Sequence, residues 1–143
     1  MTAHELKAIC DACKQPVDDR DGCIWIDNGM INERQESVRA WEKEGMDRTP
    51  AGELVIRNAM EIMNYPGGVR WNVHHSACDL DIDADAYSIE VERLRSWADL
   101  AHWTAHLMGK AWLGDTDWRK VLDSAAHGEG TRITPVAAPR LHH

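Results

Sequence analysis

Two short pairs of metal-binding residues constrain this chain more than any other feature. Cys10 and Cys13 form a Cys-x-x-Cys pair near the start, and His75 and Cys78 form a His-x-x-Cys pair near the middle. Zinc prefers four tetrahedral sulfur and nitrogen donors, and a spacer of two residues lets one tight turn direct both side chains at one ion. Because the two pairs supply a complete set of four ligands and leave no position for water, we predict a structural zinc ion rather than a catalytic one.

Three other interpretations of these residues are weaker. Cys10 and Cys13 could form a thioredoxin-like redox pair, but the strand and helix of that motif do not surround them. His74 could replace His75, yet apolar residues alternate along the segment before it. This alternation places His75 on the same strand face as the apolar residues, and His74 on the opposite face. Cys23 could replace one of the four ligands, but it lies in an apolar segment, where a cysteine is typically a small buried hydrophobe.

Charge and composition limit the partners of this chain. The 24 acidic and 16 basic residues give a formal net charge of -8, which disfavours nucleic acid unless the basic residues gather on one face. The chain is 43% hydrophobic and 28% charged, as is typical of a globular protein, and it lacks the run of roughly 20 apolar residues that a membrane span needs. We expect a cytoplasmic protein, since the first residues lack a secretory signal and the cysteines have metal-binding spacing.

The segment between the two ligand pairs predicts a β-hairpin and two helices. Asn28 and Gly29 separate two β-prone runs within residues 22–32, and this dipeptide suits a two-residue hairpin turn. Residues 33–48 are mostly charged, so a helix there must face solvent or a partner. A helix is also expected over residues 50–64, where a threonine and a proline precede apolar residues at helical spacing.

The rest of the chain predicts strands followed by two helices. Alternating apolar residues indicate one strand that starts at Val69 and another around Tyr87. Ser96 and Asp99 have the spacing of a capping box, which predicts a helix from Trp97 onwards. A glycine-containing break then separates this helix from a second one, so the C-terminal half is expected to form a helical hairpin.

These elements together predict an α+β fold. It consists of a zinc-knuckle module with a β-hairpin and a short antiparallel sheet, followed by the helical hairpin. We expect a single zinc-stabilised domain over residues 1–127, with the zinc site and the strands in residues 1–93 and the helices in residues 94–127. Residues 128–143 contain two prolines and are expected to form a flexible tail.

Two further clusters offer weaker metal sites. Acidic residues between Asp79 and Glu90 match several positions of a calcium-binding loop, but an alanine replaces its essential glycine, so a solvated acidic loop is favoured. Asp99, His102 and His106 lie three and four residues apart on one face of a predicted helix. They could bind a second metal, although histidines that face solvent or a partner are the favoured interpretation.

Tryptophan is frequent, with 7 residues in the chain. Three of them lie outside the clearest predicted apolar faces of helices and strands: Trp41, Trp103 and Trp112. Exposed tryptophans are typical of residues that anchor protein interfaces. The alternative, which is about equally favoured, is that these side chains cover the core from a second side.

The pattern of a Cys-x-x-Cys pair, a hairpin, and a strand that ends in a His-x-x-Cys pair resembles a zinc-ribbon or LIM-like knuckle module. The segments 71–78 and 103–118 are also similar to small zinc-binding proteins of actinobacteria and their phages. The first resemblance implies a structural zinc ion and a role in binding a protein or a nucleic acid. Neither resemblance implies a catalytic activity.

We therefore expect a noncatalytic zinc-binding protein that acts, in a regulatory role, through interaction with another protein. One alternative is a zinc-ribbon protein that binds nucleic acid through a local basic patch of Lys14, Arg20, Arg57 and Arg70. A less favoured alternative is a metal-dependent hydrolase, for which a cleft with two histidines and a carboxylate is the minimum requirement. No catalytic residue and no cofactor other than the zinc ion is expected.

Overall fold

The computed structural model describes residues 4–48, 54–56, 66–78 and 85–136 of the 143-residue chain. It confirms the expected α+β class, with two three-stranded antiparallel sheets of order β2-β1-β8 and β6-β3-β7. Their strands are β1 (Leu6–Ile9), β2 (Pro16–Val17), β3 (Gly22–Asp27), β6 (Asn72–His75), β7 (Ala86–Glu90) and β8 (Ile133–Pro135). Within the described ranges, no helix has the length and apolar character that crossing a membrane requires.

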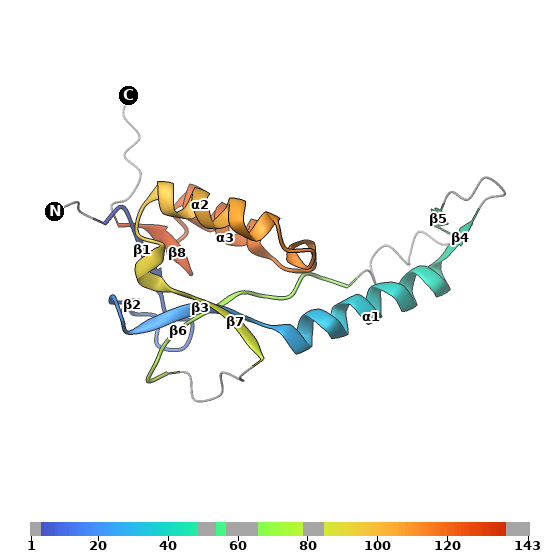
Figure 1. The fold of residues 1–143 in the computed structure, drawn as a ribbon, viewed down its shortest axis with the longest axis horizontal. Helices are drawn as coiled ribbons and strands as arrows, with labels where there is room; N and C mark the ends of the chain where they lie inside the picture. The colour runs from blue at the N-terminus through green and yellow to red at the C-terminus, as the bar shows by residue number, and fades with distance from the viewer. Residues whose placement is uncertain (1–3, 49–53, 57–65, 79–84, 137–143) are drawn as a thin grey trace, which may run out of the picture.

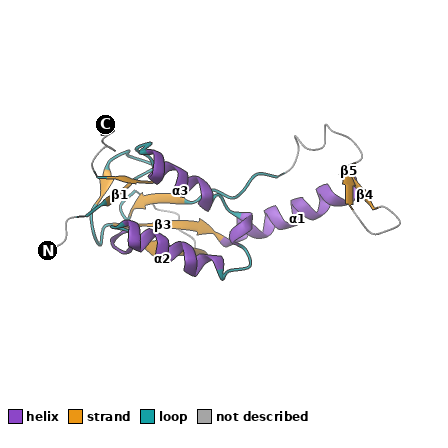
Figure 2. Cartoon of the chain, turned by 90° about the horizontal axis from the view of Figure 1, so that it is seen from above, coloured by secondary structure: helices purple, strands orange, loops and turns teal. Residues whose placement is uncertain are grey.

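Two helices cover one face of the β6-β3-β7 sheet (Figures 1 and 2). The helical elements of this part are η2 (Val91–Arg93), α2 (Trp97–Met108), η3 (Leu113–Asp115) and α3 (Trp118–His127). Strand β3 directs Ile24 and Ile26 into the core beneath the helices, where both are fully buried, while Cys23 and Trp25 point to the opposite face and stay partly exposed. The core therefore lies between this sheet and the helix pair, and it continues onto the β2-β1-β8 sheet, whose Leu6, Val17 and Ile133 belong to the same buried cluster.

The predicted C-terminal helices are confirmed, including their capping box. The Oγ atom of Ser96 accepts a hydrogen bond from the Asp99 backbone N–H at 3.0 Å, and the Asp99 carboxylate accepts one from the Ser96 N–H at 3.2 Å. The two helices contact each other through Trp118, whose Nε1–H donates to Thr104 Oγ1 at 3.0 Å. The chain turns out of α3 at Gly128, whose φ of 62° is the left-handed conformation that glycine adopts readily.

Trp71 occupies the centre of the core. Its side chain is fully buried, and its ring packs against those of Tyr87, Trp112 and Trp118 at centroid distances of 6.2, 6.2 and 5.1 Å. The indole N–H donates to Thr116 Oγ1 at 3.0 Å, so the buried polar atom is satisfied. The predicted burial of the alternating residues before the histidine ligand is confirmed, although the strand itself begins at Asn72.

The predicted hairpin at Asn28 and Gly29 is wrong. A helix, α1 (Asn28–Gly45), begins directly after β3 instead, because the Asp27 carboxylate caps its first turn. Asp27 Oδ1 accepts hydrogen bonds from the N–H groups of Gly29 at 2.7 Å and Met30 at 3.3 Å. Strand β3 pairs with β6 and β7, which come much later in the chain.

Helix α1 projects away from the two sheets (Figure 1), in agreement with its predicted charged surface. Its base is held by Ile31, which is 2% exposed, and by Asp115, whose carboxylate pairs with the Arg34 guanidinium and accepts from Gln35 Nε2 at 2.9 Å. At its far end, β4 (Met46–Arg48) pairs with β5 (Leu54–Ile56). The prediction of a helix over 50–64 is wrong within β5, and the rest of that range lies outside the described residues.

The assignment of residues 128–143 to a flexible tail is wrong for the part that the structure describes. Strand β8 pairs with β1, with Leu6 opposite Pro135 and Ala8 opposite Ile133. Ile133 is fully buried, and the preceding Arg132 is only 6% exposed. Residues 137–143 lie outside the described part of the chain. The C-terminal segment is therefore a structural part of the sheet that leads into the first ligand pair.

Candidate metal centre

The four predicted ligands converge on one point between the two sheets. Cys10 directly follows β1, His75 is the last residue of β6, and Cys13 and Cys78 lie in the turns after them. The ligand atoms of these four residues all lie within 4.8 Å of one another, so the group can hold a metal ion. The predicted spacing therefore brings together every residue that it named.

The two distances from His75 lie close to those expected for a tetrahedral site. Bonds of about 2.3 Å to sulfur and about 2.0 Å to nitrogen place neighbouring ligand atoms roughly 3.5 to 3.8 Å apart. The Nδ1 atom of His75 lies 3.2 Å from the Cys13 sulfur and 3.9 Å from the Cys78 sulfur. These two values lie on either side of the tetrahedral range, and all other pairs of ligand atoms lie within 4.8 Å, so a bound ion would draw the sulfur atoms somewhat closer together.

The first ligand pair lies at the tip of the β1–β2 connection. The Cys10 N–H donates to the Gln15 carbonyl at 2.9 Å, and the Lys14 N–H donates back to the Cys10 carbonyl at 2.9 Å. Lys14 has a φ of 65°, the left-handed conformation that closes such a tight turn. This folding of the backbone turns both thiols toward the same side.

The second ligand pair is oriented by hydrogen bonds to the segment that precedes β3. The Nε2–H of His75 donates to the Pro16 carbonyl at 2.9 Å, which leaves Nδ1 facing the sulfur atoms. The backbone turn is fixed by the Ser76 N–H, which donates to the Asp21 carbonyl at 2.7 Å, and by the Cys78 N–H, which donates to the His75 carbonyl at 3.0 Å. The imidazole is thus held in the tautomer and orientation that metal binding requires.

Strand alternation explains why His75 rather than His74 belongs to the cluster. His74 lies on the opposite face of the sheet, where its Nδ1 accepts a hydrogen bond from Trp25 Nε1 at 3.0 Å. Cys23 is directly opposite His74 in the strand pairing and therefore shares that face. Both alternative ligands point away from the metal centre.

Asp11, which the sequence analysis did not single out, connects the two ligand pairs. Its backbone N–H donates to the Val73 carbonyl at 2.7 Å, and its Oδ2 accepts from the Val73 N–H at 2.7 Å. The Arg70 guanidinium binds the same carboxylate through both terminal nitrogens, at 2.8 and 2.9 Å. Burial acts to raise the pKa of Asp11, but these hydrogen bonds outweigh it and hold the pKa below its usual value.

The three cysteine sulfur atoms of the cluster favour a bound cation. Burial acts to raise the pKa of Cys10, but hydrogen bonds from the Cys13 backbone and from His75 outweigh it and lower the pKa to about 6. Desolvation and the neighbouring thiols of Cys10 and Cys13 raise the pKa of Cys78 to about 11. Three sulfur atoms this close repel one another as thiolates, and a bound dication removes that repulsion.

Gly22 permits the close approach of β3 and β6 beside the site. A Cβ atom at this position would lie 2.2 Å from the His74 carbonyl oxygen and 2.8 Å from Val17 Cγ1. We expect Gly22→Ala to force the strands apart and to lower the free energy of unfolding by about 1–3 kcal/mol, measured by urea denaturation. Gly114→Ala is the matched control, since nothing lies within 4 Å of its added Cβ. Equal stability of the two variants would contradict this account of the strand spacing.

The other predicted metal sites are not assembled within the described residues. Asp99 is used by the capping box, and His102 and His106 are exposed on α2, where their rings contact Trp103 at centroid distances of 6.0 and 5.2 Å. The group of Cys10, Cys13, His75 and Cys78 is the one metal-binding cluster found in the described part of the chain. Most of the acidic segment from Asp79 lies outside that part, and its end forms β7.

The structure changes the interpretation of Arg70 in the predicted basic patch and of Trp103 and Trp112 among the predicted tryptophan anchors. Arg70 is paired with Asp11, and Arg57 lies outside the described residues. Trp103 and Trp112 are partly buried against the core, which supports the alternative that they cover it from a second side. The exposed tryptophan is Trp97, at 43%, which the sequence analysis used only to mark the start of a helix.

The comparisons with known proteins assign no family to this chain. No protein-family model matches it, and no significant similarity to a curated protein or to a solved structure was found. The functional argument therefore depends on the chemistry of the residues themselves.

Proposed function

We propose that this chain is a noncatalytic protein-binding domain whose two sheets are held together by a structural zinc ion. The observation that carries the proposal is the closed set of three sulfur donors and one imidazole, with all ligand atoms within 4.8 Å. A set of four protein ligands leaves no open position for water or substrate, which is typical of structural zinc sites. Zinc rather than a hard cation is favoured because thiolates are soft ligands.

The metal identity can be tested directly on the purified full-length chain. Elemental analysis should find one zinc ion per chain, and replacement with cobalt should give the visible absorption of a tetrahedral, thiolate-rich site. A chain purified under reducing conditions without any bound metal, and unable to take up zinc or cobalt, would contradict the proposal.

The contacts of Asp11 predict that it supports metal binding without being a ligand. Asp11→Ala removes the carboxylate that joins Arg70 to the backbone of β6, so the two ligand turns are less well oriented. We expect zinc affinity to fall about tenfold to a hundredfold, measured by competition with a chromophoric chelator. Asp123→Ala, which changes an exposed carboxylate on α3, should leave the affinity unchanged. Equal affinity of the two variants would show that Asp11 does not orient the ligands.

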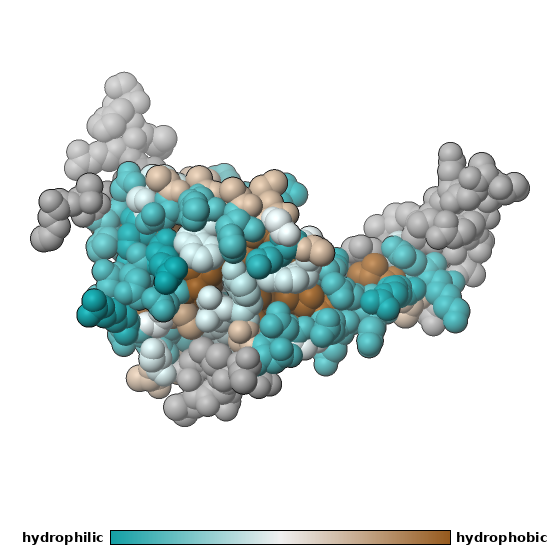
Figure 3. Space-filling model, viewed as in Figure 1, coloured by the Kyte–Doolittle hydropathy of each residue, from teal (hydrophilic) through white to brown (hydrophobic). Residues whose placement is uncertain are grey.

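An exposed apolar groove between α2 and α3 supports the protein-binding role. The groove has a volume of about 440 Å³, and its walls include Trp97, Ala101 and Met108 from α2 and Leu122 and Ala126 from α3. Met108 is 72% exposed, which is unusual for a large apolar side chain. Figure 3 shows apolar side chains along the upper side of the molecule, over α2.

The occupant that this groove fits best is an amphipathic helix of a basic partner protein. The small alanine side chains that line the groove allow a third helix to approach closely, and Trp97 and Met108, at the two ends of α2, can enclose large apolar side chains. The net charge of -8 favours a partner with basic residues flanking its apolar face.

The groove can be tested with one substitution that fills it with charge. A partner is first identified by affinity purification from the native host, and its binding is then measured with purified components. Ala101→Glu should weaken binding at least about tenfold, because an unpaired carboxylate would be buried in the interface. Ala40→Glu on the exposed surface of α1 should bind like the unmodified chain. A partner that binds both variants equally would not use this groove.

A further inference from the structure

A second cavity lies at the edge of the β2-β1-β8 sheet and belongs to neither the metal centre nor the apolar groove. It has a volume of about 660 Å³, within the range of small-molecule sites. The cavity exists because β2 has only two residues, so β1 continues past its end. Beyond the end of β2, the backbone of Arg95 pairs with this part of the chain instead. Its carbonyl accepts hydrogen bonds from the N–H groups of Glu5 at 2.8 Å and Leu6 at 2.9 Å.

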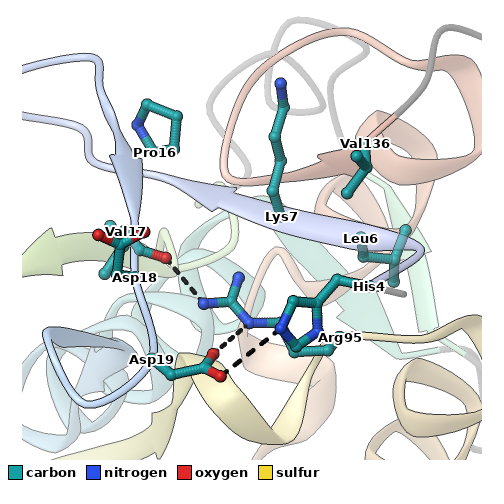
Figure 4. Close-up of a pocket in the computed structure, with 9 residues that line it drawn as sticks. All are labelled: His4, Leu6, Lys7, Pro16, Val17, Asp18, Asp19, Arg95 and Val136. Carbon is teal, nitrogen blue, oxygen red and sulfur yellow. Dashed lines mark hydrogen bonds and ion pairs between the residues drawn. The ribbon is translucent and has the colours of Figure 1, made fainter. Parts of the chain in front are cut away.

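The side chain of Arg95 forms one wall of this cavity (Figure 4). It folds back toward β2, where Nη2 donates to the Val17 carbonyl at 2.8 Å and Nε donates to Asp19 Oδ1 at 2.7 Å. Only 10% of this side chain is exposed. Among the residues that the structure describes, its third nitrogen, Nη1, has no hydrogen-bond partner. A largely buried guanidinium N–H without an acceptor is unfavourable, so an acceptor in the cavity would be stabilised.

The other groups around the cavity define what such an acceptor can be. Lys7 also lines the cavity, but Figure 4 shows its side chain on the other side of β1, pointing away from Arg95. Lys7 therefore adds positive charge to the cavity only at a distance from the Arg95 guanidinium. Asp19 already neutralises part of the Arg95 charge, and Asp18 adds another carboxylate, so a dianion such as phosphate would be repelled more strongly than a monoanion. A ligand with a single negative charge therefore fits better.

The remaining wall residues are apolar. Pro16, Val17 and Val136 line the cavity together with Leu6, whose side chain is fully buried in the sheet. An apolar body of the ligand would lie against these residues while its charged end faced Arg95. Pro16 also accepts the hydrogen bond from the zinc ligand His75, so one wall of the cavity is fixed by the metal centre.

We propose that this cavity binds a carboxylate attached to an apolar body, with Arg95 Nη1 as its charge partner. Arginine suits this role because its planar guanidinium presents its remaining N–H groups in a fixed direction. The same chemistry occurs in a small free acid and in the C-terminus of a peptide with apolar last residues. The site is independent of the apolar groove proposed for a helical partner.

The test is a titration of the zinc-loaded full chain with hexanoate. Binding is followed by the NMR chemical shifts of the backbone amides. Shifts should centre on Val17, Asp19, Arg95 and Val136, with a Kd on the order of 1 mM for so small an acid. Hexanol, which has the same body without the charge, should bind about tenfold more weakly or worse. Shifts of equal size with hexanol, shifts centred on the α2–α3 groove, or no shifts at about 20 mM hexanoate would overturn the proposal.

Substitutions separate the charge partner from effects on folding. Lys7→Ala removes only a distant charge and should weaken hexanoate binding no more than about twofold, while Lys120→Ala on exposed α3 should leave it unchanged. Arg95→Lys keeps the charge and loses the planar fork, and it should weaken binding about tenfold. Thermal unfolding of each variant verifies that it is folded. Unchanged binding by Arg95→Lys would overturn the proposal.

A titration with peptides distinguishes the two sources of the carboxylate, a small free acid and a peptide C-terminus. A tetrapeptide ending in leucine and valine is compared with its C-terminal amide in the same NMR titration. Tighter binding of the free acid than of hexanoate, with loss of binding by the amide, supports the proposal and assigns the site to peptide C-termini. Weaker binding of the peptide than of hexanoate, at the same residues, supports it for small free acids. Equal binding of peptide and amide contradicts recognition of the carboxylate.

Discussion

Chelation of the metal should lower the free energy of unfolding by at least about 3 kcal/mol and loosen the sheet end of the molecule first. The four candidate ligands come from the β1–β2 connection and from the end of β6 with the turn that follows it, so a bound ion would join segments that are far apart in the chain. Without the ion, the three sulfur atoms repel one another once they ionise. Thermal unfolding followed by circular dichroism, with and without EDTA, measures the effect.

Two cysteine variants provide a matched test of the same expectation. Cys13→Ser removes a predicted ligand and should abolish stoichiometric zinc binding, whereas Cys23→Ser changes a cysteine that faces the other side of the sheet. The second variant should keep one zinc ion and change stability by less than about 1 kcal/mol. Hydrogen exchange should then show loss of protection in β1, β2 and β6 for Cys13→Ser alone. Identical unfolding curves with and without EDTA would refute a structural role for the metal.

The ligand cluster could be predicted from the sequence because its determinants are local. A two-residue spacer fits a tight turn, and the alternation of a strand decides between His74 and His75. Both rules need only a few neighbouring residues, and the structure places the four ligand atoms together as those rules require. The capping box at Ser96 was predictable for the same reason.

The features that were missed depend on contacts between distant segments. The Asn28–Gly29 dipeptide fits a hairpin turn, but β3 finds its partners in β6 and β7, and the Asp27 carboxylate starts a helix instead. Strand β8 has three residues, too few for a periodic pattern. The roles of Asp11 and Arg95 arise from hydrogen bonds to segments far away along the chain, which no spacing rule contains.

A buried ion pair between Asp117 and Arg132 joins the C-terminal segment to Trp71, the residue directly before β6. Arg132 Nη1 lies 2.8 Å from Asp117 Oδ2, and the two side chains are only 7% and 9% exposed. Asp117 also accepts a hydrogen bond from the Trp71 N–H at 2.8 Å, and Arg132 donates to the Trp71 carbonyl at 3.2 Å. Both charges therefore hold the same backbone residue at the centre of the core.

Loss of either charge should destabilise the protein by about 3–5 kcal/mol, because the remaining partner is left buried without compensation. Asp117→Asn and Arg132→Met should each show this loss in urea unfolding at neutral pH, and the double variant should lose far less than the sum of the two. The exposed pair of Arg93 and Glu90, 3.9 Å apart with side chains 59% and 62% exposed, is the control. Arg93→Met should change stability by less than about 0.5 kcal/mol, since water screens that pair. Additive effects of the two core substitutions would show that Arg132 and Asp117 act separately, and the C-terminal segment would then be held by its strand pairing and Ile133 alone.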